Sequence, residues 1–341
     1  MSDRYQFPTF KAAAVQAGSV FRDAPVWFDT DATLAKGVRL IEQAAEEGAR
    51  LVVFPETWLP GFPYWGADVS DDEGLSAGSQ GLSREIWAKY LWSSIEVPGK
   101  ETAVLCEVAK RTNTMVVIGI NERDKEFRGR MYNSILYISS NGDILGTHRK
   151  ICPTSTERLF HTPGDGGENL KTVFATELGK IGGTICGEHS QLPLIYQWGM
   201  LGMEVHCSLW PGYRGIENAT DLRSRHTCLV TQSFGVLAAT YIPEDQRPRN
   251  FSRNSYFSQA GRFRGGSGII SPYGTYISGP VFDTETIVYG EIDLAECDKA
   301  RHATNLAGIY SRWDLFEVRV QQRSTAPTRD MAHDAVFKPS I

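Results

Sequence analysis

The chain has 341 residues, a formal net charge of −5 at neutral pH and a hydrophobic content of 41%. These values are typical of one large globular α/β domain. With no basic patch, they argue against nucleic acid as a partner. The N-terminus lacks the apolar segment of a signal peptide. The sequence contains no run of about 18 apolar residues, so no membrane span is expected.

The six cysteines are widely spaced and form no CxxC pair. In a chain of this length without a signal peptide, this pattern predicts free thiols in the reducing cytoplasm. Zinc sites need Cys and His ligands at short spacing. The nearest approaches are His206 with Cys207 and Cys186 with His189. We therefore expect neither a metal ion nor an organic cofactor.

The first half of the chain alternates between strand and helix patterns. Leu34, Val38, Ile41 and Ala45 recur at helical spacing, and Asn141-Gly142 is a strong hairpin signal. The predicted elements are a strand at 10–18, a helix at 29–49, a strand at 50–56, a helix at 100–112, a strand at 114–123 and a hairpin at 131–150.

The second half continues the alternation, with further hairpins. It predicts two strands within 172–186, a helix at 192–202, a strand at 204–210, a helix at 216–234, a strand at 235–241 and three strands within 265–280 and 286–294. Helices alternating with both single strands and hairpins indicate a layered α/β fold with mixed sheets. We expect one domain over 1–320, a tail at 321–341, and functional or interface loops at 66–84 and 243–267.

Three predicted strands end in residues that can carry chemistry. Glu56 follows "VVFP", Lys150 follows "GTHR", and Cys186 follows "GGTI". A charge placed directly after an apolar strand is expected to be partly buried and to need a partner, so Glu56 and Lys150 should meet. Taken singly, each residue has a plainer interpretation: a helix cap, a surface lysine and a small buried thiol.

The segments around these residues resemble the nitrilase superfamily, in its nitrilase branch. The similar blocks are "FPETWLPGFPYW", "HRKICPT" and "CGEH", and the resemblance extends from residue 10 to about 320. It implies a four-layer αββα sandwich of pseudo-symmetric halves. It also implies a Glu56-Lys150-Cys186 catalytic triad with Glu157 beside it. Members of this family pair into αββα–αββα dimers, and those of the nitrilase branch often extend into spirals.

The neighbourhood of the triad leaves several roles open. Many nitrilases have Trp where this chain has Gly187, which predicts extra room for substrate, and Glu188 favours the nitrilase branch over amidases. Tyr64, Trp65 and Trp210 are candidates for the substrate pocket, although packing roles suit Tyr64 and Trp65 equally. His189 either orients the Cys186 loop or is structural, the second being favoured. Arg149 is expected to form a structural ion pair.

The resemblance implies hydrolysis of a small organic nitrile to a carboxylic acid and ammonia. Cys186 would attack as Glu56 takes its proton, and Lys150 and the Gly187 N–H would stabilise the developing charge. The alternative is an amidase or N-carbamoyl amide hydrolase with the same triad. A papain-like Cys–His pair is disfavoured because His189 is too close in sequence, and a non-catalytic scaffold would not need all three residues.

Overall fold

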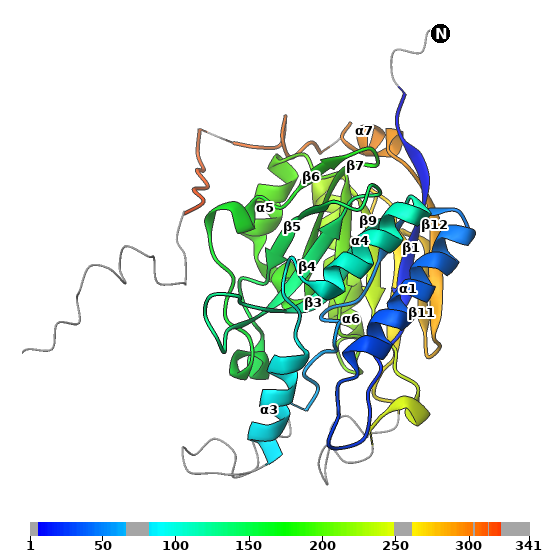
Figure 1. The fold of residues 1–341 in the computed structure, drawn as a ribbon. Helices are drawn as coiled ribbons and strands as arrows, with labels where there is room; N and C mark the ends of the chain where they lie inside the picture. The colour runs from blue at the N-terminus through cyan, green and yellow to red at the C-terminus, as the bar shows by residue number, and fades with distance from the viewer. Residues whose placement is uncertain (1–5, 66–81, 249–260, 303, 313, 322–341) are drawn as a thin grey trace, which may run out of the picture.

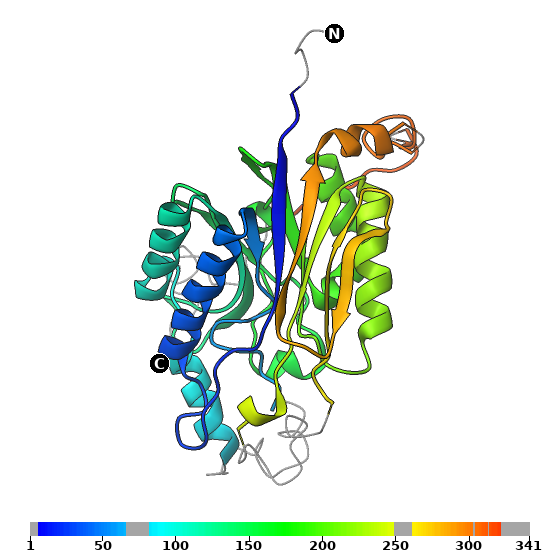
Figure 2. The same cartoon turned by 90° about the vertical axis from the view of Figure 1, so that its right-hand side faces the viewer.

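Two six-stranded sheets face each other, and helices cover the outer face of each. This is a computed structural model that describes residues 6–65, 82–248, 261–302, 304–312 and 314–321. Figure 1 shows the fold. The view in Figure 2 places α1 (Thr30–Glu46) and α4 (Lys100–Thr112) on one outer side and α6 (Glu217–Thr231) on the other. The predicted four-layer αββα sandwich is confirmed.

The first sheet combines strands from both ends of the chain. Its order is β12 (Thr286–Asp293), β1 (Thr9–Gln16), β2 (Ala49–Val53), β3 (Met115–Arg123), β4 (Met131–Ile138) and β5 (Ile144–Arg149). Helices α1 and α4 pack on it. The first turn of α1 is capped by Asp29, whose carboxylate accepts a hydrogen bond from the Ala32 N–H at 2.9 Å.

The second sheet repeats the pairing pattern of the first. Its order is β6 (Phe174–Thr176), β7 (Gly179–Ile185), β8 (Val205–Trp210), β9 (Phe234–Ala239), β10 (Gly265–Ile270) and β11 (Tyr276–Phe282). Read from β12 and from β6, both sheets pair as antiparallel, parallel, parallel, antiparallel, antiparallel. The two halves are therefore topologically alike. Helices α5 (Leu192–Met200) and α6 follow strands of this sheet, whereas α7 (Ala295–Ala300) follows β12 of the first sheet.

Alternation along the strands divides the buried side chains between two interfaces. In β1, Ala12 and Ala14 face the second sheet, whereas Ala13 and Val15 face the layer of α1 and α4. All four are fully buried. Successive strand residues point to opposite faces, so a strand covered on both sides needs apolar residues at every position. This explains why β1 has a continuous apolar run rather than a polar–apolar alternation.

Among the described residues, the sequence missed two α-helices, α3 (Leu82–Ser93) and α7, and misplaced several boundaries. Helix α3 begins inside the segment predicted as a loop at 66–84, and the rest of that loop lies outside the described residues. In the predicted loop at 243–267, a 3-10 turn covers Glu244–Gln246, β10 begins at Gly265, and residues 249–260 lie outside the description. The helices predicted at 29–49 and 216–234 end earlier, at Glu46 and Thr231.

Two predictions about chain organisation stay predictions. These are the single domain over 1–320 and the tail at 321–341, of which residues 322–341 lie outside the described part. Within the described residues, no helix is both long and apolar enough to span a membrane.

Candidate active site

The topology brings the three predicted strand ends to one edge of the sandwich. In the first sheet β2 is parallel to β3, and β3, β4 and β5 are successively antiparallel, so β2 and β5 run in the same direction. Their carboxyl ends lead to Glu56 and Lys150. Cys186 directly follows β7 in the facing sheet, and β7 contacts β4 of the first sheet. Residues remote in sequence thus meet at one place.

Lys150 lies between two carboxylates. Its Nζ donates to Glu56 Oε1 at 2.8 Å and to Glu157 Oε2 at 2.7 Å. The side chains of Lys150 and Glu56 are fully buried, and that of Glu157 is 5% exposed. The predicted contact between Glu56 and Lys150 is confirmed. Such a buried group of charges is tolerated only when its members are paired and hydrogen-bonded.

Asn133 completes this cluster, and sequence reasoning missed it. Its Nδ2 donates to Glu56 Oε1 at 2.7 Å and to Glu157 Oε1 at 2.8 Å, so one amide joins the two carboxylates. Asn133 lies on β4, within the apolar run "MYNSILYI". A buried amide in a central strand needs partners. That signal in the sequence could have identified Asn133 as part of a polar site.

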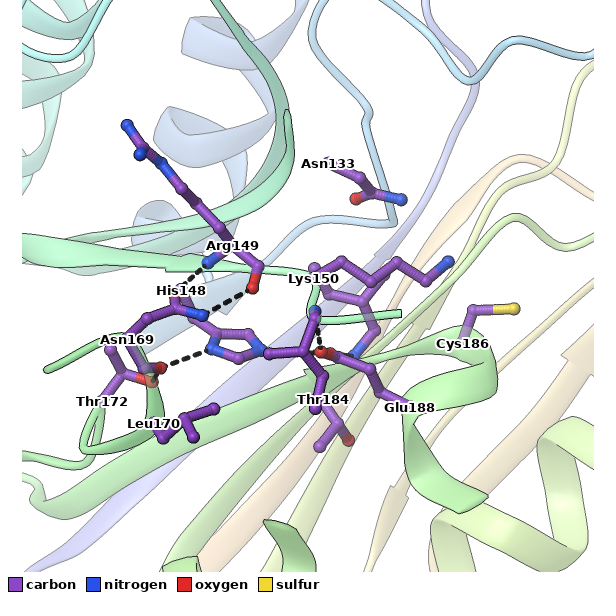
Figure 3. Close-up of polar contacts among 12 residues, drawn as sticks. Asn133, His148, Arg149, Lys150, Asn169, Leu170, Thr172, Thr184, Cys186 and Glu188 are labelled. Carbon is purple, nitrogen blue, oxygen red and sulfur yellow. Dashed lines mark hydrogen bonds and ion pairs between the residues drawn. The ribbon is translucent and has the colours of Figure 1, made fainter. Parts of the chain in front are cut away.

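Cys186 has a backbone conformation that L-residues rarely adopt. Its φ is +47°, and it begins a 3-10 helix over Cys186–Ser190. Such a conformation costs on the order of 1–3 kcal/mol and persists only where the surroundings enforce it. Its side chain is 9% exposed, and Figure 3 shows the Lys150 side chain extending toward it. The sharp turn therefore places the buried thiol at the end of the strand, beside Lys150.

The charges of the cluster set the protonation states. Burial alone would lower the pKa of Lys150, but the carboxylates of Glu157 and Glu56 raise it well above its ordinary value. Burial raises the pKa of Glu56 to about 7, against the lowering effect of Lys150. Burial alone would raise the pKa of Glu157, but Lys150 and His161 together hold it below its ordinary value. Lys150 and Glu157 are thus a stable ion pair, whereas Glu56 can exchange a proton near neutrality.

The thiol itself is held in its neutral form. Burial and the negative charge of Glu56 raise the pKa of Cys186 well above its ordinary value. Lys150 and a hydrogen bond from the Gly187 N–H act in the opposite direction. Because the thiolate is the reactive form, attack by Cys186 requires a base. Glu56 Oε2 is buried and has no hydrogen-bond partner among the described residues, so this oxygen can accept the proton.

Comparison with known proteins shows the family of this chain. A family model described as carbon–nitrogen hydrolase matches residues 11–302. The chain belongs to the carbon–nitrogen hydrolase family. It is 32% identical over 331 residues to the bifunctional nitrilase/nitrile hydratase NIT4A of Lupinus angustifolius, covering 96% of this chain and 90% of that protein. It is 34% identical over 325 residues to an aliphatic nitrilase of Sinorhizobium fredii, with 94% and 99% covered. The predicted membership of the nitrilase superfamily is confirmed, and this hydrolase acts on carbon–nitrogen bonds.

Solved structures support the fold of this carbon–nitrogen hydrolase. Nit3 of Saccharomyces cerevisiae aligns with a TM-score of 0.68 at 20% identity, covering 90% of this chain and 97% of that one. The NitFhit protein of C. elegans aligns with a TM-score of 0.69 at 17% identity, covering 94% and 69%. At these identities the likeness shows the shared fold alone.

The predicted pocket aromatics of this hydrolase are deeply packed. Trp65 is 1% exposed and lies against Phe28 and Phe160, with centroids 4.9 and 5.4 Å apart. Tyr64 is 4% exposed, and its hydroxyl donates to the Pro211 carbonyl at 3.0 Å. Packing therefore accounts for most of the surface of both side chains. Their assignment to substrate binding stays a prediction.

His189 and Trp210 form a buried support beneath the Cys186 loop. The His189 Nδ1 lies 2.8 Å from the Cys186 carbonyl, and its ring stacks on Trp210 with centroids 4.9 Å apart. The Trp210 Nε1 donates to Ser208 at 2.8 Å. Burial and neighbouring His206 lower the pKa of His189 well below its ordinary value, so its ring is neutral. The favoured structural interpretation of His189 agrees with this geometry.

The region beside Gly187 is less open than its lack of a side chain predicts. A Cβ added at Gly187 would lie 2.7 Å from Thr154 Oγ1, so the Thr154 hydroxyl already occupies that space. The extra room expected from Gly187 is therefore not found next to its Cα. Arg149, by contrast, pairs with Glu122 as predicted.

Tyr213 is a further residue that sequence reasoning missed. It is half-buried and packs against Phe62, with centroids 6.4 Å apart. Burial raises the pKa of Tyr213, and the negative charges of Glu56 and Glu157 raise it further. The sequence signal is the segment "WPGY", which carries a tyrosine just beyond the end of β8. Within the described residues, no group of His, Cys, Asp and Glu side chains could hold a metal ion.

Proposed function

We propose that this carbon–nitrogen hydrolase is a nitrilase that converts an organic nitrile to the carboxylic acid and ammonia. The observation that carries the proposal is the joint placement of a buried Lys150 between two carboxylates and a strained Cys186 beside them. The relatives named nitrilases, with similarity over nearly the whole chain, support the nitrile as substrate. In this proposal Glu56, Lys150 and Cys186 are catalytic, and Glu157 holds Lys150 in place.

The first half of the reaction forms a covalent adduct on Cys186. Glu56 Oε2 accepts the thiol proton while the sulfur attacks the nitrile carbon and one C–N π bond opens onto nitrogen. Lys150 and the Gly187 N–H stabilise the charge that develops on nitrogen. The proton held by Glu56 then passes to that nitrogen. The product of this half is a thioimidate, and Glu56 is again a carboxylate.

The second half releases ammonia and then the acid. Glu56 takes a proton from water as the water oxygen adds to the thioimidate carbon, and that proton passes to nitrogen. The hydroxyl proton of the tetrahedral adduct then passes to the nitrogen as the C–N bond breaks, so ammonia leaves and a thioester remains on Cys186. A second water, activated in the same way, cleaves the C–S bond and restores the thiol. If the C–S bond breaks first, the product is an amide.

A comparison of matched substrates tests the proposal against the amidase and N-carbamoyl alternative. A primary amide brings more polar groups than a nitrile, and each that stays unpaired in a buried site costs about 1–3 kcal/mol. That cost corresponds to roughly one to two powers of ten in kcat/KM. We therefore expect a nitrile to exceed the amide with the same R group by this factor, measured as ammonia release. A preference for the amide or the N-carbamoyl compound would refute the nitrilase assignment.

The assembly and location of the enzyme are parts of the same proposal. We expect a homodimer that can extend into a larger spiral, acting in the cytoplasm on a small molecule without a cofactor. Leu222 and Leu229 on α6 are 63% and 49% exposed, which supports a further contact on this outer layer. Light scattering of the purified protein measures the assembly, and a monomer at working concentration would contradict this part.

A further inference from the structure

A buried carboxylate links the two loops that carry Lys150 and Cys186. Glu188 is fully buried, and its Oε2 accepts the Ile185 N–H at 3.0 Å, directly before Cys186. Its Oε1 accepts the Ile151 N–H at 2.7 Å, directly after Lys150. One side chain therefore fixes the backbone next to both groups, although they come from different sheets (Figure 3).

His148 holds this carboxylate from the other side. Its Nε2 lies 3.1 Å from both oxygens of Glu188, and its Nδ1 lies 2.9 Å from the Asn169 carbonyl. His148 is fully buried, and its ring packs edge-on against Trp198 with centroids 5.0 Å apart. A carbonyl can only accept, so Nδ1 carries a proton. A proton is also shared between Nε2 and the carboxylate, which joins the pair by a charge-assisted bond.

Asn169 extends this link along the same loop. Its side-chain oxygen accepts the Arg149 N–H at 2.6 Å, and its Nδ2 donates to the Arg149 carbonyl at 2.9 Å. The backbone on both sides of Lys150 is therefore held, at Arg149 through Asn169 and at Ile151 through Glu188.

We propose that Glu188, held by His148, is a positioning residue that sets the spacing between Cys186 and Lys150. The inference rests on the proposed function, because the spacing matters only if the thiol and the ammonium act on one substrate. Glu188 does not touch substrate: it is fully buried, and N–H groups of the protein occupy both oxygens. It acts on the reaction only through the two backbone segments that it joins.

The contact set requires a carboxylate rather than an amide. Both oxygens of Glu188 accept from a backbone N–H, and both face His148. In Glu188→Gln one acceptor becomes an NH₂ donor that faces a backbone donor, so one of the two loops loses its anchor. A displacement of about 1 Å at a reacting group can cost on the order of 10²-fold in rate.

The test compares Glu188→Gln and His148→Gln with the control Glu122→Gln. Glu122 is also a buried carboxylate, 4% exposed, which accepts from Ser134 Oγ at 2.7 Å and pairs with Arg149. It adjoins the Lys150 side of the site but makes no hydrogen bond to the Cys186 loop in the described structure. The measurements are kcat and KM for a nitrile that the native enzyme hydrolyses, the melting temperature, and the rate at which iodoacetamide alkylates Cys186, located by mass spectrometry.

We expect Glu188→Gln to lower kcat by about 10²-fold and His148→Gln by about tenfold, with KM changed by less than about threefold. Because the two residues share one contact, the double variant should be no slower than Glu188→Gln. Glu122→Gln should lose a similar amount of thermal stability with kcat within about threefold of the native value. If Glu188→Gln does not fold, the kcat and the alkylation rate of His148→Gln test the positioning role.

Alkylation separates this inference from the proposed function. Displacing Lys150 removes a charge that lowers the pKa of the thiol, so both variants should react with iodoacetamide at least about threefold more slowly at one pH. One outcome is that the native enzyme releases no ammonia from nitriles while both variants are alkylated more slowly than it. This would refute the proposed function but not the positioning role. The other outcome is that the native enzyme hydrolyses the nitrile, but Glu188→Gln and His148→Gln have the same kcat and the same alkylation rate as Glu122→Gln. This would refute the positioning role alone.

Discussion

Replacing Lys150 by Met removes the only cation that contacts Glu56 and Glu157 by hydrogen bond in the described structure. Methionine fills a similar volume, so the main change is electrostatic. Two carboxylates then remain buried, joined by the amide of Asn133. Removing one partner of a buried ion pair costs about 3–5 kcal/mol, because the other charge is left uncompensated. We expect the free energy of unfolding of Lys150→Met to fall by this amount at about pH 8 and activity to be lost.

The loss of stability should shrink as the pH falls. Without the ammonium, the pKa values of both carboxylates rise, so the folded variant binds more protons than the folded native enzyme. Each additional proton changes the stability difference by about 1.4 kcal/mol per pH unit. A carboxyl group whose pKa is raised in the folded state stabilises that state at low pH. This stabilisation is lost as the pH rises through the raised pKa. The variant should therefore approach native stability between about pH 8 and pH 5.

Urea unfolding at several pH values measures this effect, with Lys36→Met as the matched control. Lys36 pairs with Glu285 at 2.7 Å, and their side chains are 12% and 32% exposed. A solvent-accessible pair contributes about 0–1 kcal/mol, so this control should change little and show no comparable pH dependence. A loss below about 1 kcal/mol for Lys150→Met, or a loss independent of pH, would show that the cluster is not charged as described.

Three further predictions concern the reaction itself. Cys186→Ala should abolish turnover in a folded protein, and mass spectrometry with a slow substrate should find an adduct on Cys186; an adduct on Cys152 or Cys207 would contradict the assignment. Glu157→Gln should lower kcat, because Lys150 loses a partner at 2.7 Å, and near-normal kinetics would show that Glu157 is not needed. Burial raises the pKa of Glu56 to about 7, and the ionised form is the base, so kcat/KM should rise with pH through about 7; a flat profile from about pH 5 to 9 would exclude this role.

The sequence predicted the layered fold because the relevant signals are local. Apolar runs, helical spacing and the Asn141-Gly142 turn each depend on residues close in the chain, and they located most strands and helices. Helix α3 was missed because its apolar positions form a weak pattern beside a long polar segment. The predicted meeting of Glu56 and Lys150 also needed only one rule, that a buried charge requires a partner.

The parts of the site that escaped prediction depend on contacts between distant segments. Asn133 lies 77 residues from Glu56 and 24 from Glu157, and nothing in its own strand shows that both carboxylates face it. Glu188 appears in the sequence only as a residue near Cys186, yet its carboxylate also holds the N–H of Ile151, 37 residues away. A strand pattern gives the direction of a side chain but not its partner across the sheet.

The two kinds of residue also differ in what they must satisfy. Glu56, Lys150 and Cys186 stand at strand ends, where side chains can meet a substrate, so their chemistry is visible in their residue types. Asn133 and Glu188, at 1% and 0% exposure, are as deeply buried as Lys150 and Glu56, but they satisfy polar groups of the protein itself. Because a buried polar group must be paired wherever it occurs, its residue type does not distinguish a support of the active site from an ordinary structural contact. Only the partners distinguish them, and here those partners adjoin or belong to the proposed catalytic residues.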